Sequence, residues 1–190
     1  MLAAGRGVRF GGDVPKPLLE LGGRPLLAYA LDAARGAGDT LICVVSDERV
    51  AAAAGPGVEV VRNEMPERGI ASSLQAALRA LEPRAEIDAV VVGLADQPLV
   101  GAGAYRRLGA TDADLAYATY DGERGNPVRI GRVHWDEALA LTGDEGARVL
   151  FRRHPATAVP CGDTGSPADI DTPADLATVE SRWRSQTASE

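Results

Sequence analysis

The chain contains 190 residues, 45% of them hydrophobic, and carries a net charge of −7 at neutral pH. This length predicts one domain with a full hydrophobic core, and the composition excludes a disordered chain. The acidic balance argues against general nucleic-acid binding. Because there is no signal peptide and no apolar span of about twenty residues, we expect a cytoplasmic protein without membrane contact. Cys43 and Cys161 lie in apolar or strand-like runs, which favours buried free thiols over a disulfide or metal pair.

Strand-like and helix-like segments alternate along the chain. In chain order, the pattern predicts a strand end at residues 2–4, then a helix at 25–37, a strand at 41–45, a short helix at 47–54, a strand at 58–61, a helix at 70–81 and a strand at 89–94. Strands follow at 115–119 and 128–130, helices at 135–141 and 147–153, a strand at 157–160 and a helix from Pro173. This alternation predicts an α/β protein with three layers and a mostly parallel sheet.

The two ends of the chain carry further expectations. We expect one domain over residues 1–184 and a frayed tail at 185–190. The first strand is short, since only about four residues precede the glycine-rich segment and about five make a useful strand. The strand is therefore interpreted as truncated, with the natural start upstream of Met1.

A glycine-rich and basic segment follows the first strand. Gly5 and Gly7 let backbone amides approach an anion closely, and Arg6, Arg9 and Lys16 add positive charge to an otherwise acidic chain. Such a segment is suited to phosphate groups. The run matches neither G-x-x-x-x-G-K-[ST] nor a G-x-G-x-x-G turn that opens directly into a helix.

Aspartates follow the ends of predicted strands or extended segments. Asp96 comes after the most apolar strand, at the edge of the sheet where the glycine-rich segment also lies. Asp169 and Asp171 alternate with Ile170, so both carboxylates point the same way. Carboxylates that converge on a triphosphate are suited to Mg²⁺. Read singly, Asp96 fits equally a turn or helix cap, and the other two fit a solvated loop.

Three more segments are candidates for ligand contact. Gly69 and Ser73 lie at the start of the helix at 70–81, which is either a wall of a nucleotide site or an ordinary capped helix. The turn at 125–127 and the helix start at 143–148, which carries Arg148, are weaker signals. His134 and His154 lie on later helices away from these motifs, and are interpreted as surface or packing residues.

The motifs L-A-A-G-x-G-x-R, P-K, G-I-x-S-S-L, L-A-D-Q-P, G-N-P-V, G-D-x-G-A-R and D-I-D-T-P occur in this order from Leu2 to about Leu176. Together they resemble the MobA-like nucleotidyltransferase family, and within it the molybdenum cofactor cytidylyltransferases. The resemblance implies a Rossmann-like sheet of the nucleotide-diphospho-sugar transferase type. It also implies Mg²⁺-dependent transfer of NMP from an NTP to a phosphorylated acceptor, with release of pyrophosphate.

The resemblance also implies roles for individual residues. Lys16, Arg9 and Asp96 would be catalytic, and Asp96 and Asp171 would hold the metal, with Asp169 as an alternate. The nucleotide would contact Leu2, Ala3, Ala4, Gly5, Gly7, Arg9, Lys16, Gly69 and Ser73. The acceptor would contact Asn126, Pro127, Asp144 and Arg148.

The nucleotide and the acceptor are predicted less sharply than the chemistry. Ala4 in A-A-G resembles the cytidylyl-transferring side of the family, which favours CTP over GTP. The favoured acceptor is molybdopterin, with a delivery partner for cofactor insertion. Gly7, where relatives have serine, and Pro15 before Lys16 keep open a sugar phosphate or small alcohol phosphate as acceptor. The sequence also leaves open a relative of nicotine blue oxidoreductase, which the failed dinucleotide motif disfavours, and a carrier of molybdopterin without transferase activity.

Overall fold

The computed structural model describes residues 1–5 and 13–187. Its strands are β1 (Glu20–Leu21), β2 (Arg24–Pro25), β3 (Ile42–Val45), β4 (Glu59–Arg62), β5 (Ala89–Val92), β6 (Leu115–Tyr120), β7 (Glu123–Gly131) and β8 (Thr157–Pro160). Its helices are α1 (Leu26–Ala34), α2 (Glu48–Ala53), α3 (Ile70–Leu81), α4 (Ala102–Ala110), α5 (Trp135–Leu139), α6 (Arg148–Arg153) and α7 (Pro173–Thr187). The described helix α7 therefore continues into the predicted tail.

The first residues of the chain join two groups of strands into one sheet. β3 pairs with β4 in parallel, and β5, β7, β6 and β8 pair in that order. Leu2 lies between the two groups and forms parallel bridges with Val44 and with Leu94. Its N–H donates to the Gly93 carbonyl at 2.9 Å, and the Ala3 N–H donates to the Val44 carbonyl at 2.8 Å. Within this sheet only β7 runs against its neighbours, so the sheet is mostly parallel as predicted.

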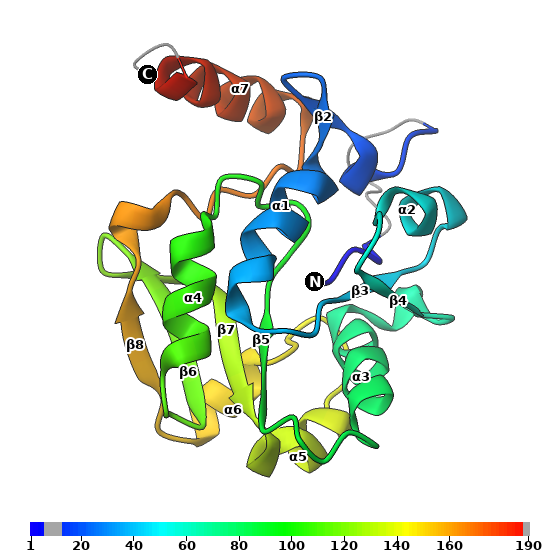
Figure 1. Ribbon diagram of the computed structural model, residues 1–190, viewed down its shortest axis with the longest axis vertical. Coiled ribbons are helices and arrows are strands. Elements are labelled where there is room, and N and C mark those ends of the chain that lie inside the picture. The colour runs from blue at the N-terminus through cyan, green and yellow to red at the C-terminus, as the bar shows by residue number, and fades with distance from the viewer. Residues whose placement is uncertain (6–12, 188–190) are drawn as a thin grey trace.

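Helices cover both faces of the sheet, which confirms the three-layer expectation. α1 and α4 pack side by side over one face, as Figure 1 shows, while α3 and α5 pack on the other. The alternation along β3 explains the division, because Cys43 and Val45 face the first helix layer and Ile42 and Val44 face the second. Cys43 and Cys161 are buried free thiols, as predicted. None of the helices in the described part of the chain has both the length and the apolarity that a membrane span requires.

Several elements differ from the sequence predictions, and among them the short strands β1 and β2 were not predicted. The helix α4 was not predicted, because Gly103 and Gly109 lower its helix propensity. Packing explains Gly109, since a Cβ there would lie 2.5 Å from the Ala37 carbonyl oxygen. β7 begins well before the predicted residue 128, because a two-residue turn at Asp121 and Gly122 folds it back onto β6. Both turn residues have positive φ, as this type of hairpin turn requires.

Gly93 offers a test of the packing between β5 and α4. A Cβ at Gly93 would overlap the Tyr105 hydroxyl and lie 2.7 Å from the ring carbon that carries it. Because Tyr105 is buried, its ring cannot move aside without disturbing the core. We expect Gly93→Ala to lower the free energy of unfolding by about 1–3 kcal/mol in urea denaturation.

Gly38→Ala is the matched control for this prediction. Gly38 is exposed, its backbone is extended, and no atom lies within 4 Å of a Cβ built there. Adding Tyr105→Phe to Gly93→Ala removes the closest atom and should recover part of the loss. Equal stability of the Gly93 and Gly38 variants would contradict the packing argument.

Candidate active site

An ammonium group held between two carboxylates lies at the carboxyl edge of the sheet. Lys16 Nζ donates to Asp96 Oδ2 at 2.6 Å and to Asp171 Oδ1 at 2.5 Å. Lys16 is the single lysine of the chain, whereas the other cationic side chains are arginines. Its side chain is buried although it is charged. A compact ammonium can contact two carboxylates at once without the planar fork that a guanidinium imposes.

Three separate segments position these groups. Lys16 opens a short 3₁₀ turn, Lys16–Leu18, whose Leu18 N–H donates to the Pro15 carbonyl at 2.8 Å. Asp96 follows β5, where the Ala95 N–H donates to the Leu2 carbonyl at 3.0 Å. Asp171 precedes α7, and its own N–H donates to Asp175 Oδ2 at 3.1 Å.

The start of α7 is capped by reciprocal hydrogen bonds between Thr172 and Asp175. The Thr172 hydroxyl accepts from the Asp175 N–H at 3.2 Å, and Asp175 accepts in return from the Thr172 N–H at 2.7 Å. Ile170 is fully buried just before this cap. Its N–H donates to the Asp96 carbonyl at 3.0 Å, and this bond holds the segment of Asp169 and Asp171 against the end of β5.

The charges of the site are strongly coupled. Burial acts to lower the pKa of Lys16, but the Asp96 and Asp171 carboxylates outweigh it, so the pKa is raised. Burial raises the pKa of the Asp169 carboxyl, and the nearby Asp96 carboxylate raises it further. Gln97 Nε2 donates to Asp169 Oδ1 at 2.9 Å and opposes this effect. Lys16 thus stays protonated, while the three aspartates concentrate negative charge around it.

The donor set fits a hard divalent cation. Asp96 Oδ1 is buried and has no hydrogen-bond partner among the described residues, which is costly unless a further ligand satisfies it. Asp96 and Asp171 reach the same point, since both contact one nitrogen. Oxygen ligands from one or two carboxylates, completed by phosphate and water, are what Mg²⁺ prefers.

A cavity of about 470 Å³ opens above Lys16 and Asp96. Its lining includes most of the residues predicted to contact a nucleotide, namely Leu2, Ala3, Ala4, Gly5, Lys16, Gly69 and Ser73. The predicted residues Gly7 and Arg9 lie outside the described part of the chain. Asn63 supports the wall, because its side-chain amide donates to the Ser72 and Ser73 hydroxyls at 2.8 and 3.0 Å.

Gly69 brings the wall of this cavity against the segment at 143–148. Its φ is +84°, and a Cβ there would lie 2.5 Å from Asp144 Oδ1 and 2.6 Å from the Gly143 carbonyl oxygen. The Ala71 N–H donates to that same carbonyl at 3.1 Å. Only glycine combines this backbone conformation with this approach. The contact places Asp144 at the border of two cavities.

The second cavity adjoins the first and is richer in arginine. Its volume is about 480 Å³, and it shares Leu2, Ile70, Leu94 and Asp144 with the first. Asn126 and Arg148, predicted to contact an acceptor, line it, whereas Pro127 is buried and is not part of the lining. Arg124 and Arg152 also line it, and sequence reasoning missed both. Arg152 was detectable, since it lies one helical turn after Arg148.

Gln97 is a further residue that sequence reasoning left without a role. It is 5% exposed, its Nε2 donates to Asp169, and its Oε1 accepts from Asn126 Nδ2 at 3.2 Å. This one side chain therefore connects Asp169 with Asn126, which lines the second cavity. Its position directly after Asp96 was the feature of the sequence that could have identified it.

A mostly parallel sheet with a cation and carboxylates at its carboxyl edge, beside two joined cavities, is typical of an α/β domain that binds a ligand at this edge. The model of one family, the MobA-like NTP transferase domain, matches residues 1–158. The chain belongs to this family of NTP transferase domains.

Curated relatives that match part of the chain include the following two. The bifunctional protein GlmU of Azoarcus sp. (strain BH72) is 35% identical over 146 residues, covering 73% of this chain and 30% of that protein. A 2-C-methyl-D-erythritol 4-phosphate cytidylyltransferase of Cereibacter sphaeroides (strain ATCC 17029 / ATH 2.4.9) is 41% identical over 112 residues, covering 56% of this chain and 49% of that protein. The chain thus spans less than half the length of these relatives.

A solved structure matches nearly the whole chain. Rv0371c from Mycobacterium tuberculosis H37Rv superposes with a TM-score of 0.79 at 33% identity, covering 95% of both chains. A second structure of Rv0371c is a complex with manganese and superposes with a TM-score of 0.74. Because 95% of the chain is covered, the likeness extends past residue 158.

The Lys16 ion pairs predict a measurable effect on stability. Lys16→Met would leave the Asp96 and Asp171 carboxylates close together without their cation. We expect the free energy of unfolding, measured by urea denaturation without nucleotide or divalent cation, to fall by about 1–3 kcal/mol. Adding Asp96→Asn and Asp171→Asn should recover part of this loss. An unchanged stability of Lys16→Met would show that the pairs contribute nothing to the fold.

Proposed function

We propose that this domain is a Mg²⁺-dependent nucleotidyltransferase that moves NMP, with CMP favoured, from an NTP to a phosphorylated acceptor. The carrying observation is Lys16 between Asp96 and Asp171, at the floor of one cavity and beside a second cavity lined by arginines. The Lys16 ammonium, beside carboxylates that can hold a divalent cation, suits a triphosphate. The arginines of the second cavity suit another anionic substrate.

The reaction is an in-line displacement at the α-phosphorus. An oxygen of the acceptor phosphate attacks, the bond from the α-phosphorus to the oxygen that bridges to the β-phosphorus breaks, and pyrophosphate leaves with that oxygen. A phosphate nucleophile is already ionised at neutral pH, so the chain needs no general base. The task of the protein is to align two anions and to neutralise them.

Lys16 is the residue best placed for neutralisation. An ammonium has three N–H donors, and Asp96 and Asp171 use two of them. The third can donate to a phosphate oxygen of the leaving pyrophosphate. Ala4 and Gly5 line the first cavity, so their backbone amides can offer further donors to the nucleotide.

The metal role is assigned to Asp96 and Asp171, with Asp169 as a neighbouring or alternate ligand. The bound ion would supply charge neutralisation on the reacting phosphates. The unsatisfied Asp96 Oδ1 supports this assignment, as does the manganese complex of the similar protein Rv0371c. Magnesium is preferred in the proposal because the donor set consists of oxygen atoms alone.

The acceptor is assigned to the second cavity, where Arg124, Arg148 and Arg152 would attract a phosphate and Asn126 and Asp144 would bind polar groups. Molybdopterin is the favoured acceptor, on the family membership and the motif order. A small alcohol phosphate is the second candidate, supported by the 41% identity to a 2-C-methyl-D-erythritol 4-phosphate cytidylyltransferase. The same relative supports CTP as the nucleotide.

A matrix of substrates tests the function. The purified protein with Mg²⁺ is given CTP, GTP, UTP or ATP, each with molybdopterin, 2-C-methyl-D-erythritol 4-phosphate or a hexose phosphate, and pyrophosphate release is measured. We expect the largest release with CTP and molybdopterin. Release with another acceptor would correct the substrate but keep the reaction class. If no combination releases pyrophosphate, the proposed activity is wrong.

A substitution at Asp96 tests the site. We expect Asp96→Asn to lower pyrophosphate release by about a hundredfold or more, because the amide cannot replace the carboxylate charge. Circular dichroism should show an unchanged fold. Asp112→Asn, at an exposed aspartate before β6, is the matched control and should keep full activity. Near-normal turnover by Asp96→Asn would remove Asp96 from the mechanism.

A further inference from the structure

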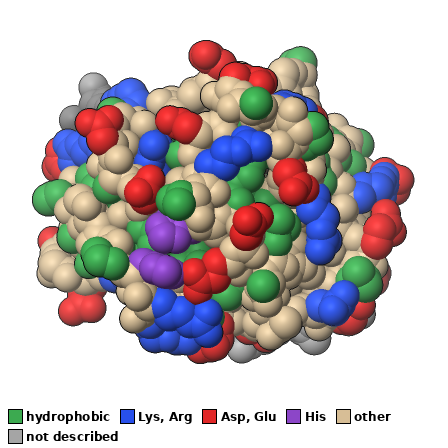
Figure 2. Space-filling view, turned by 90° about the horizontal axis from the view of Figure 1, so that it is seen from below, with side chains coloured by type: hydrophobic (Ala, Val, Ile, Leu, Met, Phe, Trp, Pro, Cys, Tyr) green, Lys and Arg blue, Asp and Glu red, His purple; other side chains and the backbone are tan. Residues whose placement is uncertain are grey.

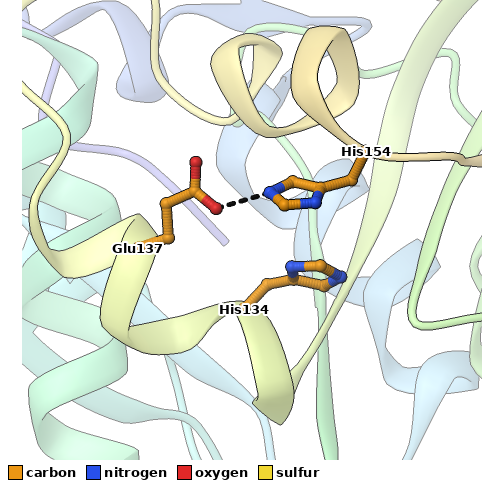
Figure 3. A group of neighbouring side chains, drawn as sticks. All are labelled: His134, Glu137 and His154. Atoms are coloured by element: carbon orange, nitrogen blue, oxygen red, sulfur yellow. Dashed lines mark hydrogen bonds and ion pairs between the residues drawn. The ribbon is translucent and has the colours of Figure 1, made fainter.

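Both histidines of the chain meet one carboxylate outside the two cavities. His154 Nε2 lies 2.5 Å from Glu137 Oε2, and the rings of His134 and His154 are 4.7 Å apart between centroids. Figure 3 shows the three side chains converging from two helical segments. None of them lines either of the two cavities. The chain contains two histidines in 190 residues, so the contact between them does not result from a high histidine content.

The backbone at this place is fixed by buried neighbours. His134 ends a 3₁₀ turn, Arg132–His134, that continues into α5, so His134 and Glu137 are three residues apart on one helical face. Trp135, which lies between them in the sequence, is buried and anchors that turn. His154 follows α6, and its N–H donates to the carbonyl of the fully buried Leu150 at 2.9 Å. The three donors are thus presented by anchored segments.

The cluster is partly buried but open to an ion. The His154 side chain is 35% exposed and that of Glu137 is 28% exposed. In Figure 2 the two histidine side chains lie next to each other on the surface, with carboxylates nearby. Arg153 Nη1 donates to Glu137 Oε1 at 2.9 Å. The hydrogen bonds from Arg153 and His154 lower the pKa of Glu137, which favours its negatively charged form.

We propose that His134, Glu137 and His154 form a binding site for a divalent cation of the zinc class. The coordinating ring nitrogens and carboxylate oxygen lie within 4.8 Å of one another, and no other such group of three occurs among the described residues. Tetrahedral zinc with bonds of about 2.0–2.1 Å needs ligand atoms about 3.3 Å apart, which small side-chain rotations can provide. Water completes the coordination.

The ligand chemistry separates this site from the aspartates. Two imidazoles and one carboxylate suit zinc, cobalt or nickel, whereas magnesium prefers oxygen ligands alone. A bound ion would connect α5 with the end of α6, the helix that begins at Arg148 in the second cavity. The site would therefore brace the helix behind that cavity.

Zinc binding by the metal-free protein is the test, measured by isothermal titration with excess Mg²⁺ present to occupy the aspartates. We expect one zinc ion per chain, and Co²⁺ in its place should give visible absorption of a low-symmetry site. His134→Gln and His154→Gln should each weaken binding by about tenfold or more. Arg153→Gln should strengthen it, because the arginine competes for Glu137.

Two controls separate this site from the active site. Asp136→Asn changes an exposed neighbour on α5 and should leave zinc affinity unchanged. Asp96→Asn with Asp171→Asn should also retain one zinc ion. The proposal is overturned if the wild-type protein binds no zinc at micromolar concentrations, or if binding disappears in the aspartate variant and survives in both histidine variants. Circular dichroism of every variant checks that the fold is kept.

Discussion

The contact of Lys16 with Asp96 and Asp171 is the interaction on which the site depends, because it connects parts of the chain that are far apart in sequence. The lysine lies 80 residues from one carboxylate and 155 residues from the other. Closing such distances is costly in chain entropy, so the contact forms only after the sheet has brought the segments together. The sheet does so because residues 1–4 run between β3 and β5. Lys16 comes after this first stretch of the chain, and Asp96 comes after β5.

The same contact explains how a buried cation can serve chemistry. A lysine in an apolar place would lose its proton, yet two carboxylates hold the charge on Lys16 and raise its pKa. In return the ammonium keeps two acidic groups close together that would otherwise repel each other. Asp96 still has one buried oxygen without a hydrogen-bond partner among the described residues. The ion pairs with Lys16 therefore do not satisfy the whole carboxylate. A ligand that carries positive charge or donors to this point is what completes it.

Much of the fold follows from local pattern. The helix at 70–81 and the strand at 157–160 occur where they were predicted, because each has a strong apolar pattern or clear boundaries. The helix α4 could not be found in this way, since its glycines oppose a helix and are explained by the closeness of Ala37 and Thr164 in space. The hairpin at Asp121 and Gly122 was a readable signal that was overlooked, and its omission shortened the prediction for β7.

Residues at the ends of strands are easier to predict as site residues than residues on separate helices. Asp96 could be assigned to the sheet edge because every parallel strand ends there, and the structure places its carboxylate on Lys16. Arg124 and Arg152 reach one cavity from a strand and a helix whose packing the sequence does not specify. His134 and His154 are the extreme case. Read one at a time, each is an ordinary surface histidine, and only the packing of α5 against the end of α6 makes them a pair with Glu137. Chemistry that depends on one helix meeting another therefore has to be read from the folded chain.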